Sequence, residues 1–383
     1  MKKTDFSDNA FGHVVRTDRG FYAFIPHPLP PQINLSTQLL QSLSRADQAI
    51  TRLDQLGKSF PIPHAIIRPF IRNEAVLSSR IEGTQTSLQG LISYELGQLS
   101  FFQDPIDARE VHNYVRALDY GLERVKSLPV SNRLMREMHA ILLQDVRGKH
   151  LTPGEFRKTQ NWIGHSGSTV ETARYVPPPV SEMQQCLSDW EKFIHAESSL
   201  PALLRIAMVH YQFEAIHPFL DGNGRLGRLI ISLLLVTWGL LSAPFLALSE
   251  FIEANRQQYY DCLLDVSRHG DWDAWLSFFL DGVVVQSNRS SSRIEKLKSI
   301  RDDYHARVSA DRSRKNLKKV VDYLFEQPIT TIPSAHDSLK LGSYTTIQRY
   351  FNKLCDFDIL TEVTGNQRNR MYQASRILHI IQS

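Results

Sequence analysis

The chain has 383 residues, of which 22% are charged and 42% hydrophobic, and its formal net charge is +4. This composition is typical of a folded globular protein of two or three domains, and it argues against a disordered or fibrous chain. A net charge of +4 is too small to indicate nucleic-acid binding by itself. The cysteines Cys186, Cys262 and Cys355 are widely spaced and odd in number, which predicts reduced thiols in a cytoplasmic protein. No apolar stretch follows the first lysines, so we expect no secretory signal.

The first thirty or so residues show little hydrophobic periodicity, and residues 27–33 (PHPLPPQ) predict an extended, proline-stiffened arm. From Thr37 to Leu280, apolar residues recur at spacings of three and four, which predicts a mainly helical body. Residues 161–180 differ, because two short β-type runs around a Gly/Ser turn predict a hairpin on that body. The expected helices cover 37–56, 69–82, 107–126, 131–144, 182–195, 201–216, 225–241, 250–267 and 272–285.

Residues 229–248 are almost wholly apolar and long enough to cross a bilayer. Arg225 and Arg228 immediately precede this run, however, and Pro244 interrupts it. A central helix that is apolar on all sides fits a large helical domain equally well. We therefore favour a buried helix and expect no membrane partner.

After Gly282 the composition changes. Residues 286–318 are polar and charged, which predicts a linker and an exposed helix. Residues 319–383 show helices followed by two strands around a Gly-Asn turn, the order of a winged helix-turn-helix. Its recognition helix (343–353) and wing (365–370) would offer these residues to DNA: Thr345, Thr346, Gln348, Arg349, Arg368 and Arg370. The alternative is a module for protein interaction or dimerisation.

Residues 217–228 read HPFLDGNGRLGR and stand directly before the long apolar run. Gly222 to Gly224 permit unusual backbone angles, and the unpaired N–H groups of the helix that begins there form an anion site. Arg225 and Arg228 lie on the first turns of that helix, where guanidinium groups can clamp a polyphosphate. Asp221 can hold Mg²⁺ between phosphate oxygens, and His217 can accept a proton from a hydroxyl. This combination indicates nucleotide phosphoryl chemistry.

HPFLDGNGRLGR resembles the signature of the Fic family, HPFx[DE]GNGRxxR, and matches it at each fixed position. The resemblance implies transfer of AMP from ATP to a Ser, Thr or Tyr hydroxyl of a target protein or of the enzyme itself. It implies that His217 is the general base and that Asp221 is the Mg²⁺ ligand. The remaining residues would bind ATP, with the α-phosphate on the glycine turn and the β- and γ-phosphates on the arginines: Gly222, Asn223, Gly224, Arg225, Leu226, Gly227 and Arg228.

The resemblance extends to other segments. Residues 154–164 followed by 173–180 resemble the flap of the family, a hairpin that aligns the target segment by strand addition. Residues 251–280 resemble the downstream helices, and this implies that Tyr260 faces the adenosine, with Asn255 as a weaker candidate. The alternative role for Tyr260 is core packing.

The segment SSRIEG (78–83) ends a predicted helix, and Glu82 would lie in its last turn, where the helix dipole disfavours an anion. From the residues alone, a solvated Glu82 or a local pair with Arg80 is favoured. The segment resembles the inhibitory motif [ST]xxxE[GN] of Fic proteins, however. This resemblance implies that Glu82 pairs with Arg228, that Ser78 helps to fix the inhibitory helix, and that basal activity is low.

The expected protein is mainly α-helical, with a Fic-type helical core, a small β-hairpin flap and a C-terminal winged helix-turn-helix domain. Three alternatives to AMP transfer stay open: removal of AMP, transfer of another phosphate-linked group, and nucleotide sensing by a DNA-binding regulator without catalysis. The sequence also leaves open a homodimer and the choice between DNA and protein as a partner. The expected boundaries are an N-terminal arm and helix (1–60), an inhibitory helix region (61–105), a catalytic core (106–285), a linker or helix (286–318) and the winged-helix domain (319–383).

Overall fold

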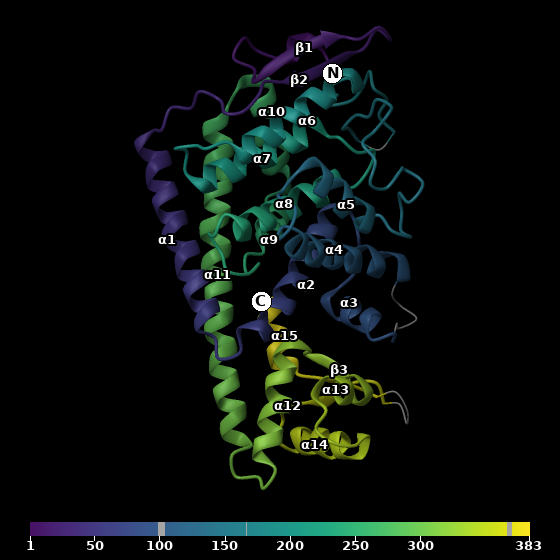
Figure 1. The fold of residues 1–383 in the computed structure, drawn as a ribbon, viewed down its shortest axis with the longest axis vertical. Helices are drawn as coiled ribbons and strands as arrows, with labels where there is room; N and C mark the ends of the chain where they lie inside the picture. Colours follow the sequence, from purple (N-terminus) through teal and green to yellow (C-terminus); the bar gives the residue numbers. More distant parts are fainter. Residues whose placement is uncertain (99–103, 166, 366–369) are drawn as a thin grey trace.

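The computed structural model describes residues 1–98, 104–165, 167–365 and 370–383, and it is elongated and mainly helical (Figure 1). The mainly helical class is therefore confirmed. The helices are α1 (Thr37–Ser59), α2 (Pro63–Ile81), α3 (Leu88–Glu95), α4 (Pro105–Arg124), α5 (Asn132–Leu142), α6 (Val180–His195), α7 (Ala202–Ile216), α8 (Asn223–Thr237), α9 (Leu248–Ala254), α10 (Arg256–His269), α11 (Trp272–Arg307), α12 (Arg314–Glu326), α13 (Ile332–Leu339), α14 (Tyr344–Asp356) and α15 (Ser375–Gln382). The strands are β1 (Gly12–Arg16), β2 (Tyr22–Pro26), β3 (Ile329–Thr331), β4 (Thr361–Glu362) and β5 (Met371–Gln373).

Helices α7 and α8 form the centre of the larger part of the molecule, and they pack against each other. Almost every residue of α8 is buried, so the apolar run is a core helix, as expected. The helix ends at Thr237, and the rest of the run is largely irregular up to Leu248. Within the described residues, no helix combines the length and the hydropathy that are needed to cross a membrane.

The N-terminal segment is more ordered than the sequence predicts. Strands β1 and β2 pair antiparallel, from Gly12 opposite Pro26 to Arg16 opposite Tyr22. Strand β2 packs against α6 and α7, and its Phe24 is fully buried. Neither strand, GHVVR or YAFIP, alternates apolar and polar residues, so the sequence gives no strand signal there.

The expected hairpin at 161–180 is paired antiparallel but is not built of two regular strands. Its described residues hold one isolated antiparallel bridge, between Ile163 and Tyr175. Side chains from outside the segment hold it instead: Arg157, which is almost fully buried, donates hydrogen bonds to the carbonyl oxygens of Pro178 and His217. The prolines that close the segment cannot donate to a strand ladder, which explains why the pairing stops after one bridge.

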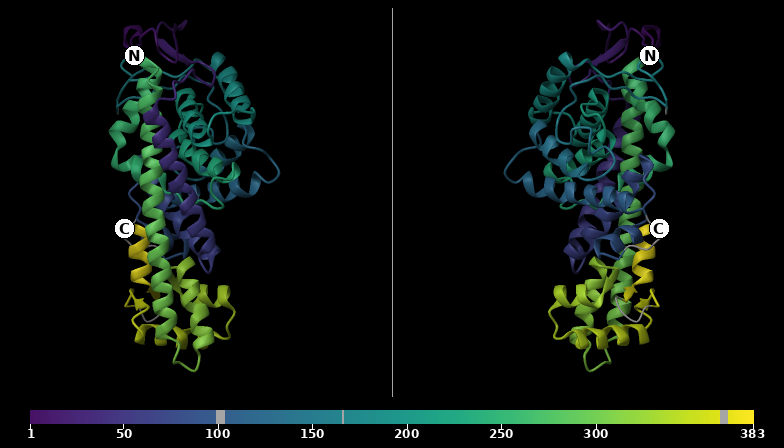
Figure 2. Two further views of the ribbon diagram at one scale, coloured as in Figure 1. Left: turned by 90° about the vertical axis from the view of Figure 1, so that its left-hand side faces the viewer. Right: turned by 90° about the vertical axis from the view of Figure 1, so that its right-hand side faces the viewer.

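The expected linker and exposed helix at 286–318 are mostly helix, because α11 continues unbroken from Trp272 to Arg307. This helix runs beside α1 and reaches from the larger part of the molecule to the C-terminal elements (Figures 1 and 2). Its serines Ser287, Ser290 and Ser291 are buried. Small polar residues in this stretch therefore serve close helix packing, although in the sequence they indicate solvent exposure.

Helix α2 begins at Pro63 rather than near Pro69. Proline is favourable at the first position of a helix, because its missing N–H group has no intrahelical acceptor there. Pro69 lies inside the helix. The C-terminus of α2 at Ile81 agrees with the predicted end, and Glu82 follows it directly.

The C-terminal elements follow in the order α12, β3, α13, α14, β4, β5 and α15, and β3, β5 and β4 form one antiparallel sheet in that spatial order. The expected helices and the two strands near the C-terminus are present, whereas β3 and α15 were not expected. The assignment as a winged helix-turn-helix domain stays a prediction. Helix α12 packs on α2, and α15 packs on α11 and α2. The C-terminal elements therefore touch the helix that precedes Glu82.

Candidate active site

The turn between α7 and α8 carries the HPFLDGNGRLGR segment. Helix α7 ends at Ile216, and His217 adopts the left-handed region (φ 47°, ψ 60°), which is unusual for a residue other than glycine. Gly222 is also left-handed (φ 77°) and caps the N-terminus of α8. Asn223 fixes the turn, because its side chain accepts from the N–H of Phe219 (2.9 Å) and donates to the Phe219 carbonyl oxygen (2.8 Å).

His217 lies at the edge of a cavity of about 690 Å³. Its Nδ1 is 3.3 Å from the carbonyl oxygen of Glu214, which can only accept, so Nδ1 carries the proton and Nε2 is left as an acceptor. Burial lowers the pKa of His217 to about 4. The imidazole is therefore neutral at pH 7, and this is the form that a general base requires.

Glu82 and Arg228 meet in this cavity. Arg228 is 2% exposed, and its Nη2 donates to Glu82 Oε1 at 2.7 Å. Ser78, one turn before Glu82, accepts from Arg228 Nε through its hydroxyl (2.8 Å) and from Nη2 through its carbonyl (3.0 Å). Burial alone would raise the pKa of Glu82, but Arg228 together with the nearby Arg225 and Arg256 lowers it. Glu82 does not form the local pair with Arg80 that its neighbours in sequence favour, because Arg80 pairs with Glu253 (3.4 Å) instead.

The Glu82 carboxylate also lies against the N-terminus of α8. A Cβ atom at Gly224 would come within 2.5 Å of Glu82 Oε1 and 3.0 Å of Arg228 Nη1. Glycine is therefore needed for this close approach. Because the N-terminus of a helix attracts anions, Glu82 takes a position in which a phosphate would be favourable.

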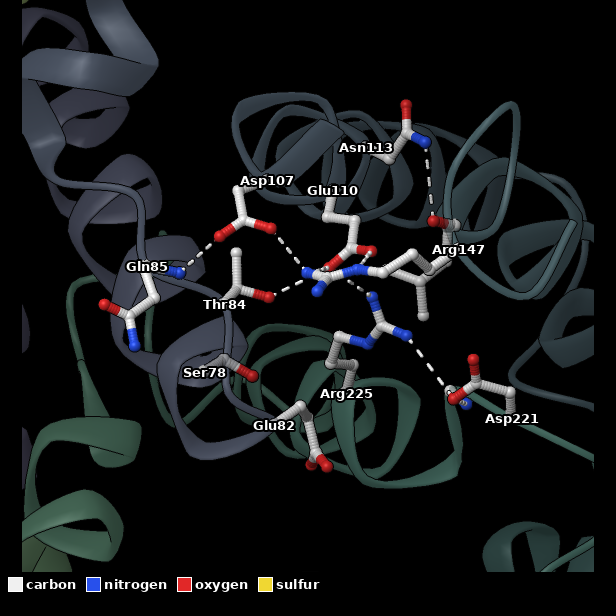
Figure 3. A network of polar contacts seen from close by, with 12 residues as sticks. Ser78, Glu82, Thr84, Gln85, Asp107, Glu110, Asn113, Arg147, Asp221 and Arg225 are labelled. Atoms are coloured by element: carbon white, nitrogen blue, oxygen red, sulfur yellow. Dashed lines mark hydrogen bonds and ion pairs between the residues drawn. The ribbon is translucent and has the colours of Figure 1, made fainter. Parts of the chain in front are cut away.

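Arg225 and Arg228 point in different directions, although the sequence predicts a joint clamp. Arg225 is 4% exposed and faces α4, with Nη1 at 3.8 Å from Glu110 Oε2 and Nη2 at 3.6 Å from Asp221 Oδ1 (Figure 3). Its Nε and Nη1 make no hydrogen bond to any described residue. Arg228 is thus held by the inhibitory segment through Nε and Nη2, whereas Arg225 retains unused donors.

Asp221 accepts from the N–H of Gly222 through Oδ1 (2.6 Å), and 39% of its side chain is exposed. Its backbone is held by His139, which sequence reasoning missed. His139 Nε2 donates to the Asp221 carbonyl (3.0 Å), and Nδ1 accepts from the N–H of Gly154 (2.8 Å). The ring stacks on Phe219 with centroids 3.8 Å apart. No sequence signal marks His139, because it lies some eighty residues before the turn.

The predicted nucleotide-binding residues divide into three groups. Lining the cavity are Glu82, His217, Gly224, Arg228 and Tyr260. On the adjoining turn and the start of α8, outside the lining, are Asp221, Gly222, Asn223 and Arg225. Facing elsewhere are Leu226, Gly227 and Asn255.

The three residues in the last group point away from the cavity, and their part in ATP binding stays a prediction. Leu226 is fully buried in the core. Gly227 faces Glu214, since a Cβ there would come within 2.2 Å of Glu214 Oε1. The side chain of Asn255 folds back and donates to the carbonyl of Phe251 at 2.9 Å. Tyr260, in contrast, lines the cavity beside Tyr259.

Glu214 is a second residue that sequence reasoning missed. It lines the cavity, its Oε1 has no hydrogen-bond partner among the described residues, and its Oε2 is 4.0 Å from His217 Nδ1. Burial raises its pKa to about 8, so the carboxyl group is largely protonated at pH 7. Its position on the last turn of α7, three residues before His217, was the available signal.

The C-terminal candidates lie on and near α14. Thr345 and Arg349 are exposed, and Thr346 is half-buried. Gln348 is engaged internally, because its amide donates to Tyr372 Oη at 2.9 Å. Arg370 is exposed, and Arg368 lies outside the described residues.

Residues 40–123 match the family model described as Fic/DOC family N-terminal, and residues 129–235 match the model described as Fic/DOC family. A protein adenylyltransferase Fic of Culex quinquefasciatus is 27% identical over 301 residues, which are 73% of this chain and 55% of the relative. One from Drosophila grimshawi is 28% identical over 185 residues, which are 46% of this chain and 35% of the relative. The chain thus spans about half or less of the length of these relatives.

Solved structures share the fold. A Fic family protein from Desulfovibrio desulfuricans G20 aligns with a TM-score of 0.59 at 17% identity, covering 90% of this chain and 98% of the other. Fic-1 (residues 134–508) from C. elegans aligns with a TM-score of 0.51 at 23% identity, covering 67% and 74%. With both of its domain models matched in sequence order, the chain belongs to the Fic/DOC family.

Proposed function

We propose that this chain transfers AMP from ATP to a Ser, Thr or Tyr hydroxyl of a target protein and of itself, and that Glu82 restrains the reaction. The observation that carries the proposal is the cavity in which a neutral His217, the N-terminus of α8 and the Glu82–Arg228 pair come together. The names of the relatives from Culex and Drosophila, both protein adenylyltransferase Fic, support it.

In this mechanism His217 Nε2 accepts the proton of the target hydroxyl while the hydroxyl oxygen attacks the α-phosphorus. The new oxygen–phosphorus bond forms as the bond from the α-phosphorus to the bridging oxygen breaks, and pyrophosphate leaves. The N–H groups of Asn223 and Gly224 would stabilise the charge on the α-phosphate, since the N–H of Gly222 already donates to Asp221 Oδ1. Arg225 and, once released from Glu82, Arg228 would hold the β- and γ-phosphates.

A magnesium ion fits beside Asp221. One oxygen of this half-exposed carboxylate is held by the N–H of Gly222, so the side chain is oriented and keeps its second oxygen for a ligand. A single carboxylate together with substrate phosphates is a usual Mg²⁺ environment. When bound, the ion would neutralise phosphate charge during transfer.

The Glu82 pair explains how the reaction is restrained. An Arg228 that is bonded to Glu82 and Ser78 cannot bind the γ-phosphate, so the triphosphate would lack one of its contacts and its in-line pose. The target segment would lie along Trp162 to His165, which line the same cavity.

The test is intact-mass spectrometry after incubation with ATP and Mg²⁺. Glu82→Gly should gain the mass of AMP at least tenfold faster than the wild type, and Glu82→Gly with His217→Ala should gain none. An unmodified Glu82→Gly variant contradicts AMP transfer. Loss of AMP from a pre-modified protein in the same assay would instead support the reverse reaction.

For the C-terminal elements we propose DNA as a partner. Exposed Thr345 and Arg349 on α14 support this, and so do basic residues at the start of α12, where Asn316 bonds Tyr350 of α14. The exposed basic residues there are Arg312, Arg314, Lys315 and Lys319. A duplex gel-shift that weakens steeply with added salt supports DNA binding, and no shift at low salt contradicts it.

A further inference from the structure

Two buried carboxylates lie on the first turns of α4, outside the cavity. Asp107 is 7% exposed and Glu110 is 3% exposed, and they are one helical turn apart. Figure 3 shows that both point toward the segment that follows α2 and toward Arg147. Neither carboxylate has a part in the proposed AMP transfer.

On one side these carboxylates hold the segment that follows Glu82. Thr84 donates from its hydroxyl to Glu110 Oε2 at 2.9 Å, and the N–H of Gln85 donates to Asp107 Oδ2 at 2.7 Å. Thr84 itself is 3% exposed. Helix α2 has already ended at Ile81, and Gly83 is left-handed with φ 97°. The two bonds therefore fix the chain within three residues of Glu82, in a stretch that no longer has the hydrogen bonds of a helix.

On the other side the carboxylates meet two guanidinium groups. Arg147 donates to Asp107 Oδ1 (2.5 Å) and to both oxygens of Glu110 (2.7 and 3.0 Å). Arg225, on α8, approaches Glu110 Oε2 to 3.8 Å. Glu110 thus stands between the segment after Glu82 and the helix whose N-terminus would bind phosphate (Figure 3).

We propose that Thr84 is a positioning residue, which through Glu110 and Asp107 holds Glu82 in its inhibitory contact with Arg228. This inference rests on the proposed AMP transfer and on its restraint by Glu82. Because Thr84 donates to a buried carboxylate, its hydroxyl is a stronger restraint than packing alone, and losing it leaves that carboxylate without one donor. Without the Thr84 hydroxyl, the Glu82 segment spends more time away from Arg228, and the triphosphate gains access to the arginine.

The test compares variants of matched size. Thr84→Val keeps the shape and removes the donor, and it should raise self-modification with labelled ATP about tenfold over the wild type. Thr84→Ser keeps the hydroxyl donor, so its rate of self-modification should stay as low as that of the wild type. Thr86→Val is the matched control, since Thr86 is also buried in this segment but makes no hydrogen bond to the carboxylates among the described residues. It should stay at the wild-type rate.

Two further measurements separate positioning from a general structural effect. In the Glu82→Gly background, Thr84→Val should add nothing, because the contact that it serves is gone. By hydrogen exchange, amides 83–87 should exchange faster in Thr84→Val than in Thr86→Val. If Glu82→Gly is active while Thr84→Val stays silent and protected, this inference is overturned. If Glu82→Gly itself takes up no AMP, the proposed function fails instead.

Discussion

Glu82 follows the C-terminus of α2, where its charge is disfavoured, and faces the N-terminus of α8, where it is favoured. This second helix end decides its position. The sequence around Glu82 favours solvent or Arg80, because a local reading cannot show that Arg228, 146 residues later, lies 2.7 Å away. Only the resemblance to the family motif predicts the pair. The same limit hid His139 and the Asp107–Glu110 carboxylates, because His139 lies 82 residues from Asp221 and Glu110 lies 26 residues from Thr84.

The neutral state of His217 leads to a prediction at this scale. Because burial lowers its pKa to about 4, the base form persists well below pH 6.5. Removing Glu82 should lower the pKa further, since that carboxylate raises it. For Glu82→Gly, kcat/KM at saturating Mg²⁺ should therefore show no acidic limb between pH 7 and 5.5. A tenfold loss per pH unit starting near 6.5 would mean that the imidazole titrates normally.

At the scale of elements, α2 is anchored over its whole length. Glu74, 4% exposed, accepts from the hydroxyl and N–H of Ser249 and from Tyr114 Oη (3.3 Å), and so joins α2 to α9 and α4. Helical periodicity predicted that this helix exists. It could not predict that α2 starts at Pro63 or that α11 is continuous. Proline is found both at helix starts and in loops, and a run of serines is found both in packed helices and in linkers.

Glu74 gives α2 a pH-dependent stability. Burial raises its pKa to about 7, above its value in the unfolded chain. The contribution of the protonated Glu74 to the free energy of unfolding is therefore fully present below pH 4.5. It is lost as the pH rises through 7, and the total loss is about 3 kcal/mol. Glu74→Gln cannot titrate, so its free energy of unfolding should decline less than that of the wild type between pH 5 and pH 8. Parallel curves from urea denaturation of the two proteins would contradict this.

For the whole molecule, α11 and α2 connect the catalytic part to the C-terminal elements (Figure 2). Arg72 of α2 is 2% exposed and donates to the carbonyl of Glu326 (3.0 Å), to Gln327 Oε1 (3.1 Å) and to Glu95 (2.5 Å). The shift in composition after Gly282 predicted a separate C-terminal unit. It could not predict that this unit packs on the helix that precedes Glu82.

Arg72→Met should lower the free energy of unfolding by about 3 kcal/mol, because it leaves Glu95 buried without its main partner. Arg68→Met is the control on the same helix, since Arg68 pairs with Asp119 at a half-exposed site where about 0–1 kcal/mol is expected. Chemical denaturation measures both. Equal losses in the two variants would mean that Arg72 adds nothing beyond a surface ion pair.

The central claim is that the turn between α7 and α8 holds a triphosphate beside His217 once Glu82 is removed. A crystal structure of Glu82→Gly with Mg²⁺ and a non-hydrolysable ATP analogue tests it most directly. We expect the α-phosphate on the N–H groups of Asn223 and Gly224, the γ-phosphate on Arg228, and His217 Nε2 facing the α-phosphorus. A nucleotide bound elsewhere, or a His217 ring turned away from the α-phosphate, would contradict it.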